Sequence, residues 1–328
     1  MLLRDYRKLE NYRYTIAFVG ILLLLLPRVP GIGQEVNGAF LAVKVGPIQF
    51  QPAEFAKIAI VIFLASYLRD TRHVLVVGAR KFAGITFPPL KHLGPLIVIW
   101  GLAMLMLVFI RDLGSSLMFF GAFLALLYVA TNRISFVLIG MTMFAGGAYF
   151  FSQTVSHVHD RVQIWLDPFA PGVVNDQGYQ IAQSLFAQAD GGVLGAGFGQ
   201  ALLDLPGGGS FLPEPATDMI YAVVTDELGL VGAVAVVAAY LLITYRGFKI
   251  AMLARDSFST LLAAGLTSVF ALQVFVIVGG VTRVIPLTGV TLPFVSYGGS
   301  SLLANFVLLA LLLLISDRAR RDAIGIET

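Results

Sequence analysis

The stretch FLPEPATDMIYAVVTDELGLVGAVAVVAAYLLITY, residues 211–245, decides the fold class. From Met219 to Tyr245 its only charged residues are Asp226 and Glu227. A helix needs roughly 20 apolar residues to cross the hydrocarbon core of a bilayer, so this run predicts a transmembrane helix. Carboxylates are costly near hydrocarbon, and the chain places Asp218 at the start of this helix and two more inside it. These three acids are therefore candidates for function.

The composition of the whole chain agrees with a membrane protein. Its 328 residues are 58% hydrophobic and 12% charged, with a mean hydropathy of +0.86. Soluble globular chains carry about 25% charged residues. The absence of cysteine excludes disulfides and thiolate metal sites, and four histidines leave little for a structural zinc site. No metal-ligand set is therefore assigned.

The apolar runs predict an all-α, polytopic membrane helix bundle of about eight transmembrane helices. The predicted spans are Tyr14–Pro30, Ala53–Leu68, Leu93–Ile110, Leu113–Ala130, Ile134–Phe151, Met219–Tyr245, Phe258–Val278 and Ser301–Ile315. An even number of spans puts both termini on one side. Assigning that side to the cytoplasm places most of the 22 Lys and Arg residues on the inner side, as the positive-inside rule requires.

One long segment, residues 152–217, then lies outside the cell within a single membrane domain, residues 1–328. Its apolar residues Ile181, Leu185 and Phe186 have helical spacing and predict a short helix along the outer membrane surface. Its glycine run GGVLGAGFG, Gly191 to Gly199, is superficially like a dinucleotide fingerprint. That motif needs a preceding strand in a βαβ unit, so we interpret these glycines as sites of tight turns and close packing.

Asp218 follows the extended segment PEPAT, which predicts Thr217 as the N-cap and Asp218 in the first helical turn. An ordinary first-turn acid is one interpretation, because a carboxylate there interacts well with the helix dipole. A catalytic acid or base at the membrane boundary is the other. The helix dipole lowers the pKa of such a carboxyl and burial raises it. Asp226 and Glu227 lie deeper, and one of them is expected to form a structural ion pair with Arg283 or Lys57.

Two further segments carry candidate binding residues. In QPAEFAK, Glu54 and Lys57 are spaced to pair with each other, and Lys57 could instead attract an anion into a cavity. The segment from Thr282 to Phe306 breaks the helical pattern with two prolines and several Gly and Ser residues. Broken backbone at membrane depth is tolerated where it is buried in protein or lines a cavity. Ser300 lies in SYGGSS, which opens a helix whose free N–H groups could bind an anion.

The segments QPAEFAK, GYQIAQS, LPEPATDMIYAVVTDELG and PLTGVTLPFVSYGGSSLLAN resemble, in order along the whole chain, the signature segments of the FtsW/RodA/SpoVE family, also called SEDS proteins. RVQIWLDPF and VGGVTRVIPLTG are most similar to actinobacterial RodA, the elongation member. The resemblance implies a peptidoglycan glycosyltransferase that polymerises lipid II at the outer face of the cell membrane. It also implies a class B penicillin-binding protein as partner, contact with membrane lipids and no nucleic acid.

The family's essential acid corresponds to Asp218 here. Binding or structural roles carry over to Glu54, Lys57, Asp112, Arg161 and Arg283. Ser300 is a candidate binding residue from its place in SYGGSS, and Asp226 and Glu227 are assigned structural roles. No cofactor is specified, and assistance by a divalent cation is left open, as is the choice between elongation and division.

Two departures from the family pattern leave alternatives open. The family has about ten spans, and this chain begins where the third begins, so it is expected to be N-terminally truncated. Ala42 also occupies a position where the family usually carries tryptophan. A lipid II flippase or other transporter, and a non-catalytic scaffold for the penicillin-binding protein, therefore remain alternatives to the enzyme.

Overall fold

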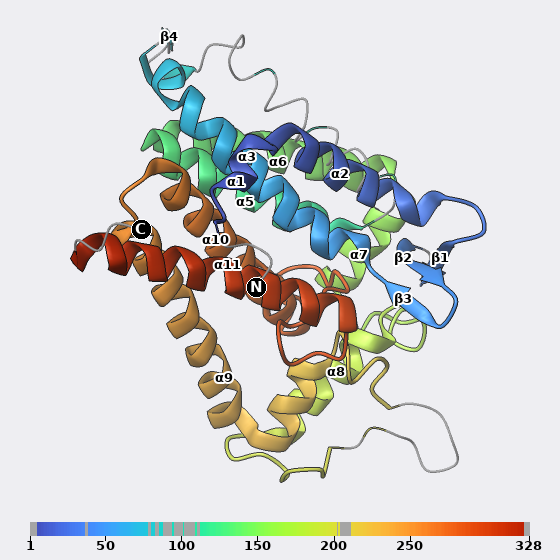
Figure 1. Ribbon diagram of the computed structural model, residues 1–328. Helices are drawn as coiled ribbons and strands as arrows, with labels where there is room; N and C mark the ends of the chain where they lie inside the picture. The colour runs from blue at the N-terminus through green and yellow to red at the C-terminus, as the bar shows by residue number, and fades with distance from the viewer. Residues whose placement is uncertain are drawn as a thin grey trace. The chain divides into compact units, whose positions relative to one another are not determined.

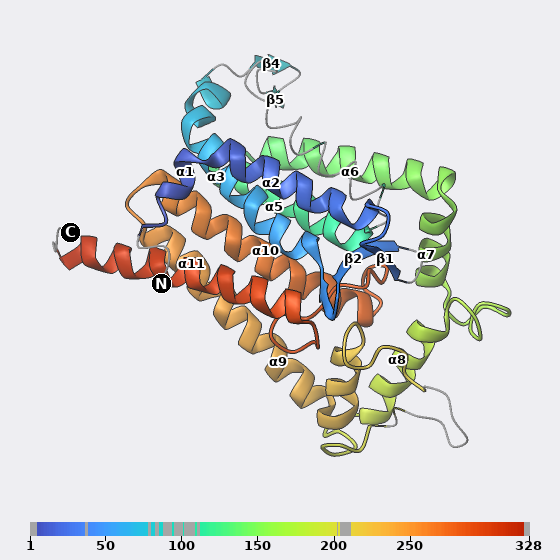
Figure 2. The same ribbon diagram turned by 45° about the vertical axis from the view of Figure 1, so that its right-hand side comes forward.

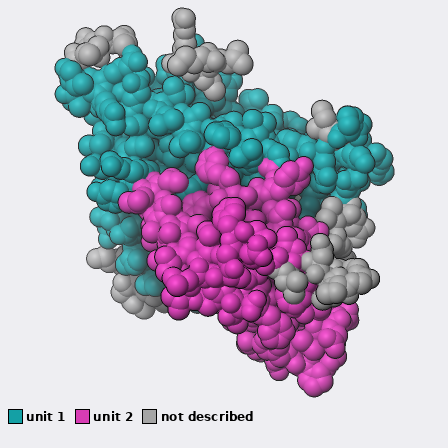
Figure 3. Space-filling view, turned by 90° about the horizontal axis from the view of Figure 1, so that it is seen from below, with its two compact units in different colours: residues 1–142, 244–272, 299–328 teal, residues 143–243, 273–298 magenta. Residues whose placement is uncertain are grey.

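The computed structural model describes residues 5–36, 39–77, 80–82, 85–87, 94, 101, 109, 112–201, 203 and 211–324. These residues form two compact units, shown in teal and magenta in Figure 3. Unit 1 comprises residues 1–142, 244–272 and 299–328, and unit 2 comprises residues 143–243 and 273–298. Both units are mainly helical, which confirms the predicted fold class.

The helices follow the apolar runs of the sequence. They are α1 (Lys8–Asn11), α2 (Arg13–Leu25), α3 (Pro52–Val77), α5 (Leu113–Thr131), α6 (Ile134–Thr154), α7 (Ser156–Leu166), α8 (Tyr179–Gly191), α9 (Ile220–Leu253), α10 (Ser257–Val281) and α11 (Gly299–Ile324), with a 3₁₀ turn η1 (Leu26–Arg28).

In unit 1, α2 lies alongside α3, and α3 also packs against α5 (Figures 1 and 2). Small residues bring the first pair close together, because a Cβ on Gly20 would lie 3.0 Å from that of Ala59. This close approach of small residues is typical of helix pairs in membranes. The contact fixes α3, the helix that carries Glu54 and Lys57.

Unit 1 also contains a small antiparallel sheet that the sequence analysis did not predict. Its strands are β1 (Gly33–Val36), β2 (Ala39–Val45) and β3 (Ile48–Phe50), in the order β1-β2-β3. Ala42, the residue in the tryptophan position, is buried on β2. A second pair of strands, β4 (Arg80–Phe82) and β5 (Ile85–Phe87), forms a hairpin.

Five of the eight predicted spans correspond to described helices that are long and apolar enough to cross a membrane: α5, α6, α9, α10 and α11. The first prediction is too long, because the helix α2 ends at Leu25 and Pro27 lies in the turn η1 that follows. The second corresponds to α3, a helix of 26 residues that carries several charges, including Glu54 and Lys57. Of the third, Leu93–Ile110, the structure describes only Gly94, Gly101 and Phe109, so the number eight stays a prediction.

In unit 2 the predicted short helix of the long segment is present as α8. Helix α9 is not continuous: Gly229 has a non-helical conformation, with φ 65° and ψ −168°. The helix changes direction there (Figures 1 and 2). The predicted span Met219–Tyr245 is therefore two helical pieces, and the first of them begins at Ile220.

Candidate functional site

The segment that carries Asp218 is a turn rather than the first turn of a helix. Helix α9 begins at Ile220, two residues after Asp218. The predicted N-cap is wrong, because α9 begins three residues after Thr217. The Thr217 hydroxyl instead donates to the Glu214 carboxylate at 2.9 Å. The Glu214 carbonyl accepts from the amides of Thr217 and Met219, which closes the turn and delays the helix.

Backbone and hydroxyl groups of the 282–298 segment hold this turn within unit 2. The amide of Tyr297 donates to the carbonyl of Ala216 at 2.7 Å. The Ser296 hydroxyl donates to the carbonyl of Thr217 at 2.7 Å and accepts from the Leu292 amide at 2.7 Å. The proline-rich lead-in and the broken segment therefore fix the position of Asp218 together.

The Asp218 carboxylate lies against the backbone at Gly289. A Cβ on Gly289 would be 3.2 Å from Asp218 Oδ2, and Gly289 has a φ of +70°. A side chain at this position would be strained and would crowd the carboxylate. Gly289 and Ser296 were missed as site residues by sequence reasoning. The sequence offered one signal for Gly289. It lies between the β-branched residues Thr288 and Val290, in the segment whose prolines interrupt the helical pattern.

Arg161 of α7 belongs to the same group of residues. Its Nη1 donates to the carbonyl of Leu287 at 3.1 Å, and its charge acts on the Asp218 carboxylate. The pKa of Asp218 is raised to about 6, first because burial disfavours the charged form and next because Glu214 repels it. Arg161 offsets part of this rise. A carboxyl group with a pKa near the working pH is suited to accept a proton.

Arg283 and Trp165 of α7 each donate a side-chain hydrogen bond to the backbone carbonyl of the other. Arg283 Nε donates to the carbonyl of Trp165 at 2.7 Å and its Nη2 donates to that of Leu166, while Trp165 Nε1 donates to the Arg283 carbonyl at 3.1 Å. The Arg283 guanidinium is therefore engaged with backbone carbonyls of α7. The predicted ion pair of Asp226 or Glu227 with Arg283 or Lys57 stays a prediction. A guanidinium satisfies the free carbonyls at a helix C-terminus well, because the helix dipole is negative there.

Asp226 and Glu227 lie at the end of the first piece of α9. Asp226 is 3% exposed. The carbonyls of Asp226 and Glu227 accept from the amides of Ala196 and Gly197, at 2.8 and 3.1 Å. These contacts place both residues in a structural junction with the glycine run rather than beside Asp218.

The remaining predicted site residues lie in unit 1. Lys57 Nζ donates to Glu54 Oε2 at 2.6 Å, and Lys57 is 2% exposed, so the self-neutralising pair is formed. The Ser300 hydroxyl accepts from the Gln51 amide at 3.0 Å, which joins the start of α11 to the residue before α3. Roles in substrate binding for these three residues stay predictions.

Asp112 caps helix α5. Its Oδ1 accepts from the Ser115 amide at 2.9 Å, and its Oδ2 accepts from the Ser115 hydroxyl at 2.6 Å. This is the usual N-cap arrangement, and replacement of such a cap costs about 1 kcal/mol. The geometry favours a structural role for Asp112.

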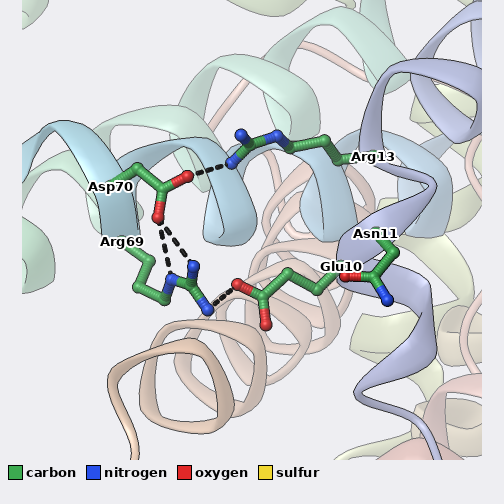
Figure 4. Close-up of a pocket in the computed structure, with 5 residues that line it drawn as sticks. All are labelled: Glu10, Asn11, Arg13, Arg69 and Asp70. Carbon is green, nitrogen blue, oxygen red and sulfur yellow. Dashed lines mark hydrogen bonds and ion pairs between the residues drawn. The ribbon is translucent and has the colours of Figure 1, made fainter.

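A shallow hollow of about 310 Å³ in unit 1 is lined by charged and polar residues (Figure 4): Glu10, Asn11, Arg13, Arg69 and Asp70. Arg69 pairs with Glu10 and Asp70, and Arg13 pairs with Asp70. Because these charges neutralise one another, the hollow is a weaker candidate than the surroundings of Asp218. Among the described residues, no group of three or more His, Asp and Glu side chains could hold a metal ion.

Comparisons with known proteins agree with the motifs. The family model of the FtsW, RodA and SpoVE proteins, described as "Cell cycle protein", matches residues 1–321. The peptidoglycan glycosyltransferase RodA of Mycobacterium tuberculosis (strain H37Rv) is 45% identical over 323 residues, which cover 97% of this chain and 66% of that protein. This chain therefore spans just under two thirds of that relative's length. Stage V sporulation protein E of Bacillus subtilis is 33% identical to this chain. The match covers 96% of this chain and 82% of that protein.

Two solved structures are also similar. A chain from a structure described as "Structural coordination of polymerization and crosslinking by a peptidoglycan synthase complex" is 26% identical with a TM-score of 0.76, covering 96% of this chain and 83% of that one. The crystal structure of Thermus thermophilus RodA is 25% identical with a TM-score of 0.64, covering 96% and 80%. A multi-pass membrane fold is common to these proteins and this chain.

Proposed function

This chain belongs to the FtsW/RodA/SpoVE family, and from that membership we propose that it is a peptidoglycan glycosyltransferase. Its substrate is lipid II, and it polymerises this substrate into glycan strands at the outer face of the plasma membrane. Both termini are then cytoplasmic, and the long segment 152–217 is extracellular. The similarity to proteins named peptidoglycan glycosyltransferase supports the reaction class.

Asp218 is the proposed general base. The 4-hydroxyl of one lipid-linked sugar forms a bond to the anomeric carbon of another, and the bond from that carbon to undecaprenyl pyrophosphate breaks. The hydroxyl proton passes to the Asp218 carboxylate, and the pyrophosphate leaves with its electron pair. The observation that carries this role is the half-buried carboxyl group held between a turn and Gly289, with a pKa of about 6.

The leaving pyrophosphate needs positive charge or N–H donors. Arg161 is the described cation that acts on Asp218, so it is the first candidate for this role. The family resemblance supports binding or structural roles for four further residues: Lys57, Glu54, Arg283 and Asp112. Ser300 is proposed as a binding residue from its place at the start of α11. Arg283 and Asp112 are the weakest of these as direct ligands, because the structure shows them engaged in stabilising helix ends.

A class B penicillin-binding protein is the proposed partner. The similar chain in the peptidoglycan synthase complex supports this, because that structure is described as coordinating polymerization and crosslinking. The elongation role is favoured by the identity to mycobacterial RodA, which exceeds the identity to the FtsW of Geobacter metallireducens, 45% against 34%.

The test uses the full-length protein with its partner, reconstituted with fluorescent lipid II. We expect glycan polymer on a gel from the wild type. Lipid II flux across proteoliposomes is measured in parallel. Flux without polymer would contradict the proposal in favour of a transporter, and partner binding with neither activity would favour a scaffold.

A further inference from the structure

The glycine run Gly191–Gly199 carries exposed apolar side chains that the proposed chemistry does not use. Val193, Leu194 and Phe198 are 63%, 82% and 83% exposed. The run GGVLGAGFG contains no charged or hydrogen-bonding side chain. Loops that face water usually carry polar residues, so this surface is unlike an ordinary extracellular loop.

The loop is held in place by the break in α9. The amides of Ala196 and Gly197 donate to carbonyls at the end of the first piece of α9. In return, the amides of Leu230 and Val231, which begin the second piece, donate to the carbonyls of Gly192 and Val193 at 2.9 and 3.2 Å. The apolar side chains are therefore presented by a fixed backbone.

These hydrogen bonds also supply the partners that backbone polar groups need inside the hydrocarbon core of a bilayer. Irregular backbone is tolerated at membrane depth only where its polar groups have partners. The loop satisfies groups that the break in α9 leaves open, and the break satisfies groups of the loop. Within the loop, the Gly195 amide donates to the carbonyl of Gly191 at 2.8 Å.

The exposed loop residues lie next to an exposed apolar surface of α9. Leu230, Val231 and Val234 are 56%, 59% and 58% exposed on a helix apolar enough to span a membrane. Because Gly192 and Val193 bond to the amides of Leu230 and Val231, the loop lies next to this surface. Phe186 of α8, the helix that leads into the loop, is also half exposed, and its ring is tilted against that of Phe169 with centroids 5.6 Å apart.

We propose that the Gly191–Gly199 loop is a membrane-inserted wedge whose Leu194 and Phe198 side chains contact lipid acyl chains beside the break in α9. The occupant is the bilayer itself. The wedge anchors the interior of the extracellular segment 152–217 at a fixed depth relative to the helix that follows Asp218. This inference does not depend on the proposed glycosyltransferase reaction.

The chain contains no cysteine, so single cysteines can be introduced without background. Leu194→Cys and Phe198→Cys would each carry a nitroxide in the full chain reconstituted in phosphatidylcholine vesicles. Val234→Cys is the lipid-facing reference, and Asn175→Cys, exposed in the same extracellular segment, is the aqueous reference. Collision of each nitroxide with oxygen and with a water-soluble nickel chelate is measured by power saturation.

We expect the oxygen-to-nickel ratio at positions 194 and 198 to match that at 234 and to exceed that at 175. A ratio like that at 175 would place the loop in water and overturn the proposal. Low accessibility to both reagents would also overturn it, because it would show that another protein surface covers the loop. Circular dichroism and gel filtration of each labelled protein confirm that the fold is unchanged.

Discussion

At Asp218, burial outweighs the helix dipole. The sequence left these two effects opposed, and the structure decides between them because the carboxylate precedes α9 by two residues instead of lying in its first turn. Glu214, whose carbonyl closes the turn, adds repulsion to the effect of burial. The exact start of a helix decides such a balance, and sequence patterns locate helix starts poorly.

The first prediction concerns the pH dependence of polymerisation. The base must be ionised, so the rate should rise with pH, reach half its plateau near the Asp218 pKa of about 6, and level off above it. Arg161 lowers that pKa, so Arg161→Gln should move the inflection to higher pH. Initial rates between pH 5 and 8 test this. A rate that does not change across this interval would exclude Asp218 as the titrating base.

The second prediction concerns stability. The folded-state pKa of Asp218, about 6, lies above the ordinary aspartate pKa of 3.8. Between these values the folded protein binds more protons than the unfolded chain, so its stability falls as pH rises through about 6. Asp218→Asn removes this effect. The variant should therefore unfold at a higher temperature than the wild type at pH 7.5, with a smaller difference at pH 4.5. A variant that is less stable at pH 7.5 would show that the carboxylate is stabilising.

The third prediction uses two glycines with positive φ. Gly289→Ala and Gly172→Ala should each cost about 1–2 kcal/mol of stability from backbone strain. A Cβ on Gly289 crowds the Asp218 carboxylate, whereas one on Gly172 meets no atom within 4 Å. To admit that Cβ the carboxylate must shift by a few tenths of an ångström. Catalysis depends on the exact position of a reacting group, so Gly289→Ala should lose more activity than Gly172→Ala. Equal activity losses in the two variants would contradict this role of Gly289.

At the scale of elements, the long apolar runs predicted the helices well, because an apolar run of about 20 residues has few stable structures other than a membrane-spanning helix. The break in α9 was not predicted, since one glycine inside an apolar run is compatible with a continuous helix. The glycine run was correctly interpreted as close packing, but its partner could not be identified, because the contact joins residues 30 or more positions apart. The sheet β1–β3 was missed because its strands are short and irregular in polarity.

The fourth prediction tests the junction between the glycine run and α9. A Cβ on Gly195 would lie 2.1 Å from the carbonyl oxygen of Glu227, whereas one on Gly199 meets no atom within 4 Å. Both glycines have positive φ. Gly195→Ala should cost about 3 kcal/mol from strain and overpacking together, and Gly199→Ala about 1–2 kcal/mol. Thermal unfolding in detergent measures the difference, and equal losses would show that the junction contributes little.

At the scale of the whole molecule, the candidate site residues fall into two groups. Glu54, Lys57, Asp112 and Ser300 lie in unit 1, and Arg161, Asp218 and Arg283 lie in unit 2. The quoted motifs contain all of these positions except Asp112. They could not show that Arg283 satisfies the end of α7 or that Asp112 caps α5, since both roles depend on partners chosen by the fold.

The central claim is that the Asp218 carboxylate accepts the proton during lipid II polymerisation. The most direct measurement compares the wild type with Asp218→Asn, each full length and bound to its partner, by the length and amount of glycan polymer formed from fluorescent lipid II at pH 7.5. General-base catalysis contributes about 10²–10⁴-fold. We expect the variant to bind its partner, remain folded and form polymer at least about a hundredfold more slowly. Polymer formed at the wild-type rate would remove Asp218 from the mechanism and contradict the account.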